Sequence, residues 1–215
     1  MKIKFKYVLL VLVGLLFVGC SIVGNHTYTP PSPRKMHSNS VIINKSKNEI
    51  WKHLISGLAN NFFVINNMDK ESGFINLSYS GDPEKYIDAG SIYSMVENLA
   101  GKREYRFSGA KKFQRYEFVE KGNLFFIERT ISLEGRINVI INEIEENRTS
   151  VTVNTKYIIS QTSVVWDVLR NQKRIVQTFS FNTGGYDTNS GGTKFQANGK
   201  LEQEIIDILN EEFNK

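Results

Sequence analysis

Residues 46–58 carry the clearest periodic pattern of the chain. Ser46 and Glu49 have the three-residue spacing of a capping box, in which each side chain accepts a hydrogen bond from the other residue's backbone amide. Behind them, apolar residues recur every three to four positions on one helical face: Ile50, Trp51, Leu54 and Leu58. The pattern predicts a helix that begins after Ser46 and follows a short strand at Val41–Ile43.

Alternation of apolar and polar residues predicts strands in several later segments. They are residues 62–65, 73–79, 113–120, 124–133, 137–144 and 151–159. The last four are separated by short polar breaks at 121–123, 134–136 and 145–148. Breaks of this length favour an antiparallel meander.

The C-terminal part contains one ambiguous segment and one clear one. Residues 163–177 fit either a twisted strand or a short helix, and the pattern leaves both open. After a glycine-rich loop over 182–194, apolar residues at helical spacing predict a terminal helix: Leu201, Ile205, Ile208 and Leu209. With the β-α-β-β start, these elements predict an α+β fold of one helix-grip-like domain, residues 41–215. In such a fold a curved antiparallel sheet packs on the long C-terminal helix.

The first 20 residues carry a targeting pattern. Three lysines precede the apolar run Val8–Val18, which is too short to span a bilayer, and a small residue then precedes the only cysteine. The tetrapeptide Phe17-Val18-Gly19-Cys20 resembles the lipobox of bacterial lipoproteins. The resemblance implies cleavage of residues 1–19 as a signal peptide and acylation of Cys20, which would anchor the mature chain to a membrane.

Residues 20–40 are predicted to be a flexible, lipid-anchored tether. They contain three of the four prolines of the chain, together with serines and asparagines, and show no apolar periodicity. Ser21 follows the cysteine, where an aspartate would resemble an inner-membrane retention signal. We therefore expect the cell outer membrane as the location, with the folded domain facing the periplasm.

The charge of the chain belongs largely to this targeting segment. The formal net charge is +5, and the three lysines of the first six residues account for the difference from the +2 of a mature chain. Basic residues between positions 102 and 115 are interleaved with acidic and aromatic ones. Nucleic-acid binding needs basic residues gathered on one face, so we expect a membrane and envelope proteins as partners and no nucleic acid.

The sequence shows no catalytic or metal-binding pattern. The three histidines, His26, His37 and His53, do not have the spacing of metal ligands. The sole thiol is assigned to acylation, and phosphate-loop, zinc-protease and nucleophile-elbow motifs do not occur. We therefore expect no enzymatic activity, no cofactor and no metal.

One loop is a candidate binding site. Residues 80–91 are rich in turn formers and acids, and a strand predicted just before them would hold the loop in place. Asp82, Tyr86 and Asp88 are the candidate recognition residues. In the alternative interpretation, the aspartates accept hydrogen bonds from nearby backbone amides in Asx-turns.

Residues 43–88 resemble the start of the folded domains in the C-subunit lipoprotein of the outer-membrane β-barrel assembly machinery. The resemblance rests on Trp51, Phe62, Phe63, Asp69, Gly73, Tyr79, Asp82 and Pro83. It implies a helix-grip fold. That family has two such domains behind a long N-terminal segment, whereas this chain is predicted to have one domain and a short tether.

Two functions follow from these observations. The first is an outer-membrane-anchored lipoprotein that acts as a non-catalytic interaction or scaffold module in the cell envelope. The alternative is an envelope binding protein that encloses an apolar ligand between the sheet and the C-terminal helix. A filled interior favours the first, and a continuous apolar cavity favours the second.

Overall fold

The structure, a computed structural model, describes residues 22–32, 38–61, 63–188 and 192–213. Strands make up 62% of it and helices 16%. In chain order the elements are β1 Val23–Thr29, β2 Ser40–Ile43, α2 Lys47–Ala59, β3 Val64–Asp69, β4 Phe74–Gly81, α3 Pro83–Tyr86, β5 Ile87–Asp88, β6 Ser91–Asn98, β7 Gly101–Ser108, β8 Phe113–Glu120, β9 Asn123–Glu145, β10 Arg148–Asp167, β11 Gln172–Asn182, β12 Tyr186–Thr188, β13 Lys194–Ala197 and α4 Lys200–Phe213.

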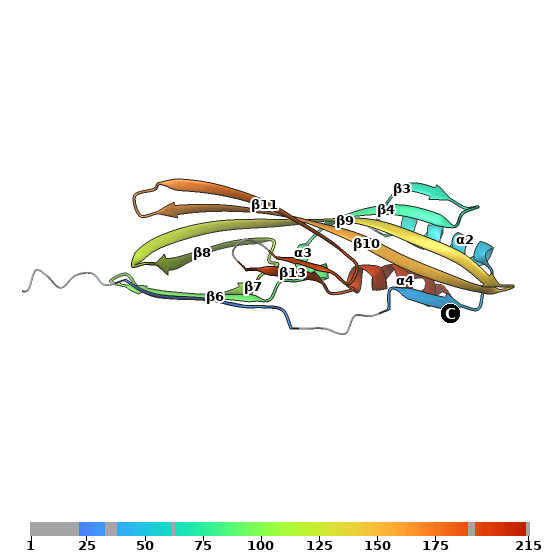
Figure 1. Cartoon of the computed structure of the whole chain (residues 1–215), viewed down its shortest axis with the longest axis horizontal. Helices are drawn as coiled ribbons and strands as arrows, with labels where there is room; N and C mark the ends of the chain where they lie inside the picture. The colour runs from blue at the N-terminus through green and yellow to red at the C-terminus, as the bar shows by residue number, and fades with distance from the viewer. Residues whose placement is uncertain (1–21, 33–37, 62, 189–191, 214–215) are drawn as a thin grey trace, which may run out of the picture.

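Strands β9 and β10 form one antiparallel hairpin that runs the length of the molecule (Figure 1). β9 has 23 residues and β10 has 20, so at about 3.3 Å per residue the hairpin is about 70 Å long. Its turn places Asn147 at φ 58°, a left-handed conformation that asparagine adopts more readily than most residues. The hairpin is the axis around which the other elements are arranged.

The seven-stranded sheet changes composition along this hairpin. Its main order is β11-β10-β9-β4-β3, while β2 pairs with β10 and β8 pairs with β9. Strands β2, β3 and β4 lie toward the β9–β10 turn, and β8 and the start of β11 lie toward the opposite end. The short sheet of order β12-β13-β5 lies near the middle of the long hairpin, between these two groups of strands.

The part of the molecule near the β9–β10 turn is covered by helices, and we call it the helix-covered half. Alternate residues of β9 and β10 contribute to its core: Leu133, Ile137, Val139, Ile141, Val151, Val153, Tyr157 and Ile159. Helix α2 adds Ile50, Leu54 and Leu58, all fully buried, and α4 adds Leu201, Ile205 and Leu209. The predicted capping box of Ser46 and Glu49 is confirmed.

Gly135 explains why one predicted break is not a turn. The segment 134–136 was expected to separate two strands, but β9 continues through it. A Cβ atom at Gly135 would lie 3.0 Å from Leu201 Cδ2 and 3.7 Å from Tyr79 Cβ. The glycine therefore allows α4 to pack closely on the strand. Close approach of another segment is a common reason for a glycine within a strand.

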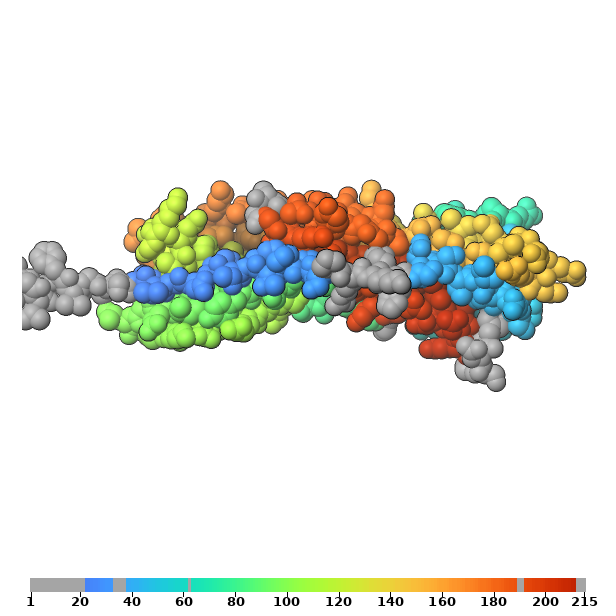
Figure 2. All heavy atoms as spheres, turned by 60° about the horizontal axis from the view of Figure 1, so that its bottom comes forward, coloured from blue at the N-terminus to red at the C-terminus, as the bar shows by residue number. Residues whose placement is uncertain are grey.

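The other half of the molecule is built from strands alone, and we call it the strand-only half. A sheet of order β1-β6-β7 packs against β8 and the adjoining parts of the long hairpin. Its core is small and consists of Ile92, Phe107 and Tyr116, with partly buried side chains around them: Tyr28, Tyr105, Phe118 and Ile127. Figure 2 shows β1 running along the surface between β6–β7 and the C-terminal strands.

Strand β1 corrects the prediction of a flexible tether over residues 20–40. Residues Val23–Thr29 pair antiparallel with β6 along their whole length, from Val23 opposite Glu97 to Thr29 opposite Ser91. The segment lacks an apolar stripe because main-chain hydrogen bonds, rather than burial of its own side chains, hold it in place. Tyr28 adds a contact at the far end, where its hydroxyl accepts from the Lys194 amide at 2.9 Å.

The predicted fold class, α+β with a helix-grip arrangement, is wrong. The protein is mostly β-sheet, with a largest sheet of seven strands, and it lacks a long C-terminal helix packed along that sheet. Helix α4 packs beside α2 and covers only the helix-covered half. The difference arises because residues 91–108 form β6 and β7 and because the ambiguous segment 163–177 extends β10 and begins β11.

Candidate functional site

The two aspartates of the predicted binding loop make local backbone contacts. Asp82 is the N-cap of α3, and its Oδ1 accepts from the Glu84 amide at 3.0 Å. Asp88 Oδ1 accepts from the Gly90 amide, also at 3.0 Å. These are the Asx-type contacts of the alternative interpretation.

Tyr86 lies in the core rather than on the surface of the loop. Its side chain is 1% exposed, and its hydroxyl donates to Glu204 Oε2 of α4 at 2.7 Å. The ring of Tyr79 meets it edge-on with centroids 4.9 Å apart. Burial, followed by the hydrogen bond to Glu204 and its charge, raises the pKa of Tyr86. Tyr86 therefore joins α3 to α4 instead of presenting a ring to a partner.

A cleft of about 360 Å³ lies beside this contact. Its walls come from the end of α2, from β4, from α3 and from α4: Asn61, Phe63, Tyr79, Ser80, Lys85, Tyr86 and Glu204. Lys85 Nζ and Glu204 Oε1 form an ion pair of 2.8 Å, and both side chains remain partly exposed. The cleft thus combines aromatic walls with one accessible charge of each sign, an arrangement suited to binding rather than to proton transfer between unpaired groups.

Neither metal binding nor membrane crossing by a helix is indicated within the described residues. No group of three histidine, cysteine, aspartate or glutamate side chains is placed to hold a metal ion there. The described helices also lack the length and apolar character that crossing a bilayer requires.

Cys20 itself lies outside the described residues, and the nearest described element is β1. Because β1 begins at Val23 opposite Glu97, the chain enters the fold where β6 ends. Three hairpin turns lie at this same end of the molecule: β6–β7, β8–β9 and β10–β11 (Figure 1). We call this region the turn end, and it is the second candidate site.

Large apolar side chains project from the turn end. Leu99, in the β6–β7 turn, is 87% exposed, and Leu169, in the β10–β11 turn, is 80% exposed. Val23 and Val168 are also more than half exposed. Isolated exposed leucines are ordinary, but these four belong to segments far apart in the sequence that the fold brings to one end.

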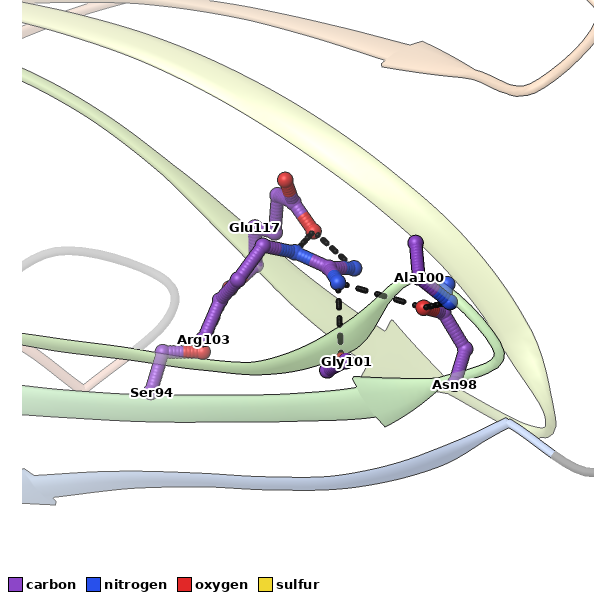
Figure 3. A network of polar contacts seen from close by, with 6 residues as sticks. All are labelled: Ser94, Asn98, Ala100, Gly101, Arg103 and Glu117. Atoms are coloured by element: carbon purple, nitrogen blue, oxygen red, sulfur yellow. Dashed lines mark hydrogen bonds and ion pairs between the residues drawn. The ribbon is translucent and has the colours of Figure 1, made fainter.

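The β6–β7 turn is fixed by a polar network, shown in Figure 3. Arg103 donates from Nε to Glu117 Oε2 of β8 at 2.8 Å and from its NH1 group to Asn98 Oδ1 at 3.1 Å and the Gly101 carbonyl at 2.9 Å. Asn98 Oδ1 also accepts from the Ala100 amide. Because residues on both sides of Leu99 are held in this way, its exposure is a property of an ordered turn.

An aromatic pair and a hollow lie next to the β10–β11 turn. The rings of Phe126 and Trp166 stack with centroids 5.9 Å apart and planes 12° apart. They line a hollow of about 570 Å³ together with Asp167, Val168, Arg170 and Gln172. Asp167 is engaged by Asn171, whose backbone and side-chain amides donate to it at 2.9 and 2.8 Å, and the side-chain hydrogen bond is the main reason that the pKa of Asp167 is lowered.

The fold and these two sites define an elongated, mostly β protein with an aromatic cleft at its helix-covered half and an exposed apolar turn end where β1 begins. Comparison with known proteins adds no relative: no family model matches the chain, and neither a curated protein nor a solved structure matches it. The resemblance of residues 43–88 to the assembly-machinery lipoprotein stays a prediction.

Proposed function

We propose that the protein is a lipid-anchored, non-catalytic interaction module of the cell envelope, attached through Cys20 to the periplasmic face of the outer membrane. The observation that carries the proposal is the position of the lipobox-like tetrapeptide. Cys20 lies three residues before β1, and β1 enters the fold at the turn end. An acyl group there would hold a compact end of the molecule near the membrane, with no long spacer between them.

The proposed role is interaction rather than catalysis. The two charged side chains of the cleft, Lys85 and Glu204, pair with each other, and Glu204 also accepts the hydrogen bond of Tyr86. The cleft offers a partner the contacting rings of Phe63 and Tyr79 as an aromatic wall, with Lys85 and Glu204 at its rim. We therefore place contact with envelope proteins at this cleft, adjoining the loop of Asp82 and Asp88.

A carrier that encloses an apolar ligand between the sheet and α4 has less support. The α4 side chains that face the sheet and α2 are fully buried, among them Leu201 and Ile205. Gly57 of α2 contacts Ile208 so closely that a Cβ atom would not fit. The cleft that touches both β4 and α4 carries the Lys85–Glu204 ion pair, which does not suit an apolar ligand, so no observation favours this alternative.

Membrane fractionation of the Cys20→Ser variant tests the anchor. Each buried acyl methylene contributes about 0.8 kcal/mol, so two or three chains on one residue hold a protein firmly. The variant should leave the membrane fraction after a high-salt wash. A Ser21→Asp variant is the matched control, because it keeps the acylated cysteine and should stay membrane-bound while moving to the inner membrane. Retention of the Cys20→Ser protein on membranes would refute the proposal.

Co-purification tests the interaction role. Lys85→Glu reverses one charge at the rim of the cleft and should remove at least one envelope protein that co-purifies with the wild-type lipoprotein. Lys156→Glu, an exposed charge reversal on the same long hairpin away from the cleft, is the control. If both variants retain every partner of the wild type, the cleft is not the contact surface.

A further inference from the structure

The apolar side chains of the turn end lack cover within the described structure. Four of them come from three separate segments, and each is more than half exposed: Val23, Leu99, Val168 and Leu169. The helix-covered half buries most of its leucines and isoleucines, although Ile42 and Ile144 are about half exposed. Exposed apolar residues that share one end of a fold are typical of a contact with a partner or a membrane.

Two further features of the turn end are typical of a membrane interface. Trp166 stacks on Phe126 beside the exposed tip of β10–β11, and tryptophan gathers at the level of lipid headgroups, where its ring is half in water. Arg170 lines the hollow next to this pair. Arginine side chains reach from an apolar contact back to headgroup phosphates.

The turn end carries basic residues that can meet an anionic surface, alongside acids that include Glu97 and Glu104. Basic residues follow the apolar tip directly: Arg170, Lys173 and Arg174. Lys121 adds a positive charge in the neighbouring β8–β9 turn, next to Glu120. Asp167 is hydrogen-bonded to Asn171, and Glu117 is paired with Arg103. Basic residues beside an apolar tip are attracted to anionic lipid headgroups.

The exposed apolar residues could contact either a protein or a membrane. The position at which the chain enters the fold favours the membrane. Cys20 precedes Val23 by three residues, a reach of about 10 Å in an extended chain. An acyl chain on Cys20 therefore brings the bilayer to within the reach of the turn end. The same short distance leaves little room for a second protein between them.

We propose that the turn end lies in the headgroup region of the membrane that holds the acyl chains, with Leu99, Val168 and Leu169 at the level of the upper acyl chains. The long hairpin then points away from the bilayer. The aromatic cleft lies about 40 Å along it, where Tyr79 and Ser80 pair with Gly135 and Glu134 of β9, and α2 lies farther out. This inference rests on the proposed anchoring at Cys20 and adds to it the orientation of the molecule.

The chain contains two tryptophans at opposite parts of the structure, which makes the orientation measurable. The Trp51→Phe variant retains only Trp166, at the turn end, and the Trp166→Phe variant retains only Trp51, on α2. The chain from Cys20 onward contains every described strand and helix. Its single cysteine couples to vesicles that carry a maleimide lipid, which recreates the attachment point whether or not the native protein is acylated.

The vesicles contain anionic phosphatidylglycerol and brominated acyl chains that quench tryptophan emission.

The expected result is quenching of Trp166 by about twofold or more, because an interfacial ring lies within reach of the upper acyl chains, and no quenching of Trp51. Absence of quenching for both would overturn the proposal. Equal quenching of both would also overturn it, since the molecule would then lie flat on the bilayer. Fractionation of native protein through Cys20→Ser is a separate measurement, so failure of the anchor and failure of the orientation are distinguishable.

A charge introduced at the tips gives a second test with a matched control. In the Trp51→Phe background, Leu99→Asp with Leu169→Asp should abolish most of the quenching of Trp166, because aspartate is costly below the headgroups. Met68→Asp changes an equally apolar residue of β3, in the helix-covered half, that is also more than half exposed, and it should leave quenching unchanged. If the tip variant instead converts a dimer in solution to a monomer and keeps full quenching, the patch binds a second copy and the proposal is overturned.

Discussion

The two halves of the molecule share the same two strands but stabilise them differently. β9 and β10 pass without interruption from one half to the other. In the helix-covered half their inner face is filled by apolar side chains of α2, α4 and β4. In the strand-only half the same face meets a core of three buried residues. Continuous backbone pairing is therefore compatible with very different side-chain packing, and the packing decides where stability resides.

Buried charges make the contrast sharper. Glu202 of α4 is 2% exposed, and its carboxylate accepts from Tyr157 and Thr183 hydroxyls at 2.7 and 2.8 Å. Arg129 of β9 is 3% exposed, and its Nε has no hydrogen-bond partner. The helix-covered half satisfies its buried charge, whereas the strand-only half leaves one partly unsatisfied, which is costly in a low-dielectric interior.

The largest expected effect tests the difference between the two cores. Phe195 of β13 belongs to the same hydrophobic core as the buried side chains of α2 and α4; it is fully buried and stacks on Phe179 with centroids 4.9 Å apart. Phe195→Ala should lower the free energy of unfolding by about 3–5 kcal/mol, the usual cost of emptying a buried aromatic site. The matched variant Phe107→Ala, in the strand-only half, should cost less because the smaller core can close around the gap. Equal losses in urea denaturation would remove the distinction between the halves.

The next largest effect concerns the buried carboxylate of Glu202, which accepts hydrogen bonds from Tyr157 and Thr183. Tyr157→Phe removes the hydroxyl that donates to Glu202 and keeps the ring in place. A hydrogen bond to a buried charged group contributes about 1.5–3 kcal/mol, so the free energy of unfolding should fall by about that amount. Tyr186→Phe is the control, since that side chain is 62% exposed. A Tyr157→Phe protein as stable as the control would show that Thr183 alone satisfies Glu202.

For the buried guanidinium of Arg129, we expect its removal to raise the free energy of unfolding rather than lower it. Within the described residues, Arg129 donates a long hydrogen bond from NH2 to the Ser108 carbonyl at 3.4 Å, and its guanidinium lies over Phe107. Among the described residues no carboxylate lies within ion-pair distance of it. Burial accordingly lowers the pKa of Arg129.

Arg129→Met should therefore stabilise the protein, by about 1–3 kcal/mol, and raise the melting temperature by about 2–4 °C per kcal/mol. Arg136→Met is the control, because Arg136 is exposed and paired with Glu134, and it should change little. A lower melting temperature for Arg129→Met would mean that packing of the guanidinium on Phe107 outweighs the cost of burying its charge.

Local signals explain the parts of the fold that the sequence predicts well. Helix α2 is specified by its own capping box and apolar face, and β8 is bounded by a two-residue turn, Lys121-Gly122, in which both residues have positive φ. That geometry is the one that a tight hairpin needs. Neither element depends on distant parts of the chain to be recognised.

The errors come from features that only tertiary contacts determine. Gly135 looks like a turn residue but is required by the approach of Leu201. Strand β1 has no apolar stripe because β6 supplies its hydrogen-bond partners. The helix-grip prediction failed for the same reason, since strands β6, β7 and β11 extend the molecule beyond the reach of α4.

The candidate sites divide in the same way. The lipobox-like tetrapeptide is contiguous and needs no fold to be found, whereas the turn end combines residues near positions 23, 99 and 169. In the sequence, each of these positions is one or two apolar residues in a polar stretch, which carries no signal alone. Tyr86 illustrates the converse, because a tyrosine in a turn-rich loop is equally typical of a surface anchor and of the buried ring that the structure shows.

The smallest expected effect is a pH dependence that arises in the strand-only half. His26 of β1 stacks on Tyr116 with centroids 5.9 Å apart and planes 6° apart. Burial, followed by the charge of Arg129, lowers the pKa of His26 below its ordinary value of 6.5. The unfolded chain therefore takes up the proton at a higher pH than the folded protein does. The stability that neutral His26 provides is complete above pH 6.5 and is lost as the pH falls from there toward the lowered pKa.

His26→Phe keeps a ring on Tyr116 and removes the titration. Between about pH 7.5 and 5, wild type should lose more stability than this variant, by less than about 1 kcal/mol because the imidazole is partly exposed to solvent. For a chain of this size that difference corresponds to about 2–4 °C or less in melting temperature. Thermal melts of the two proteins across this pH range measure it directly. If their melting temperatures fall in parallel, protonation of His26 does not weaken the contact of β1 with β8, and the strand-only half is no more sensitive to acid than the helix-covered half.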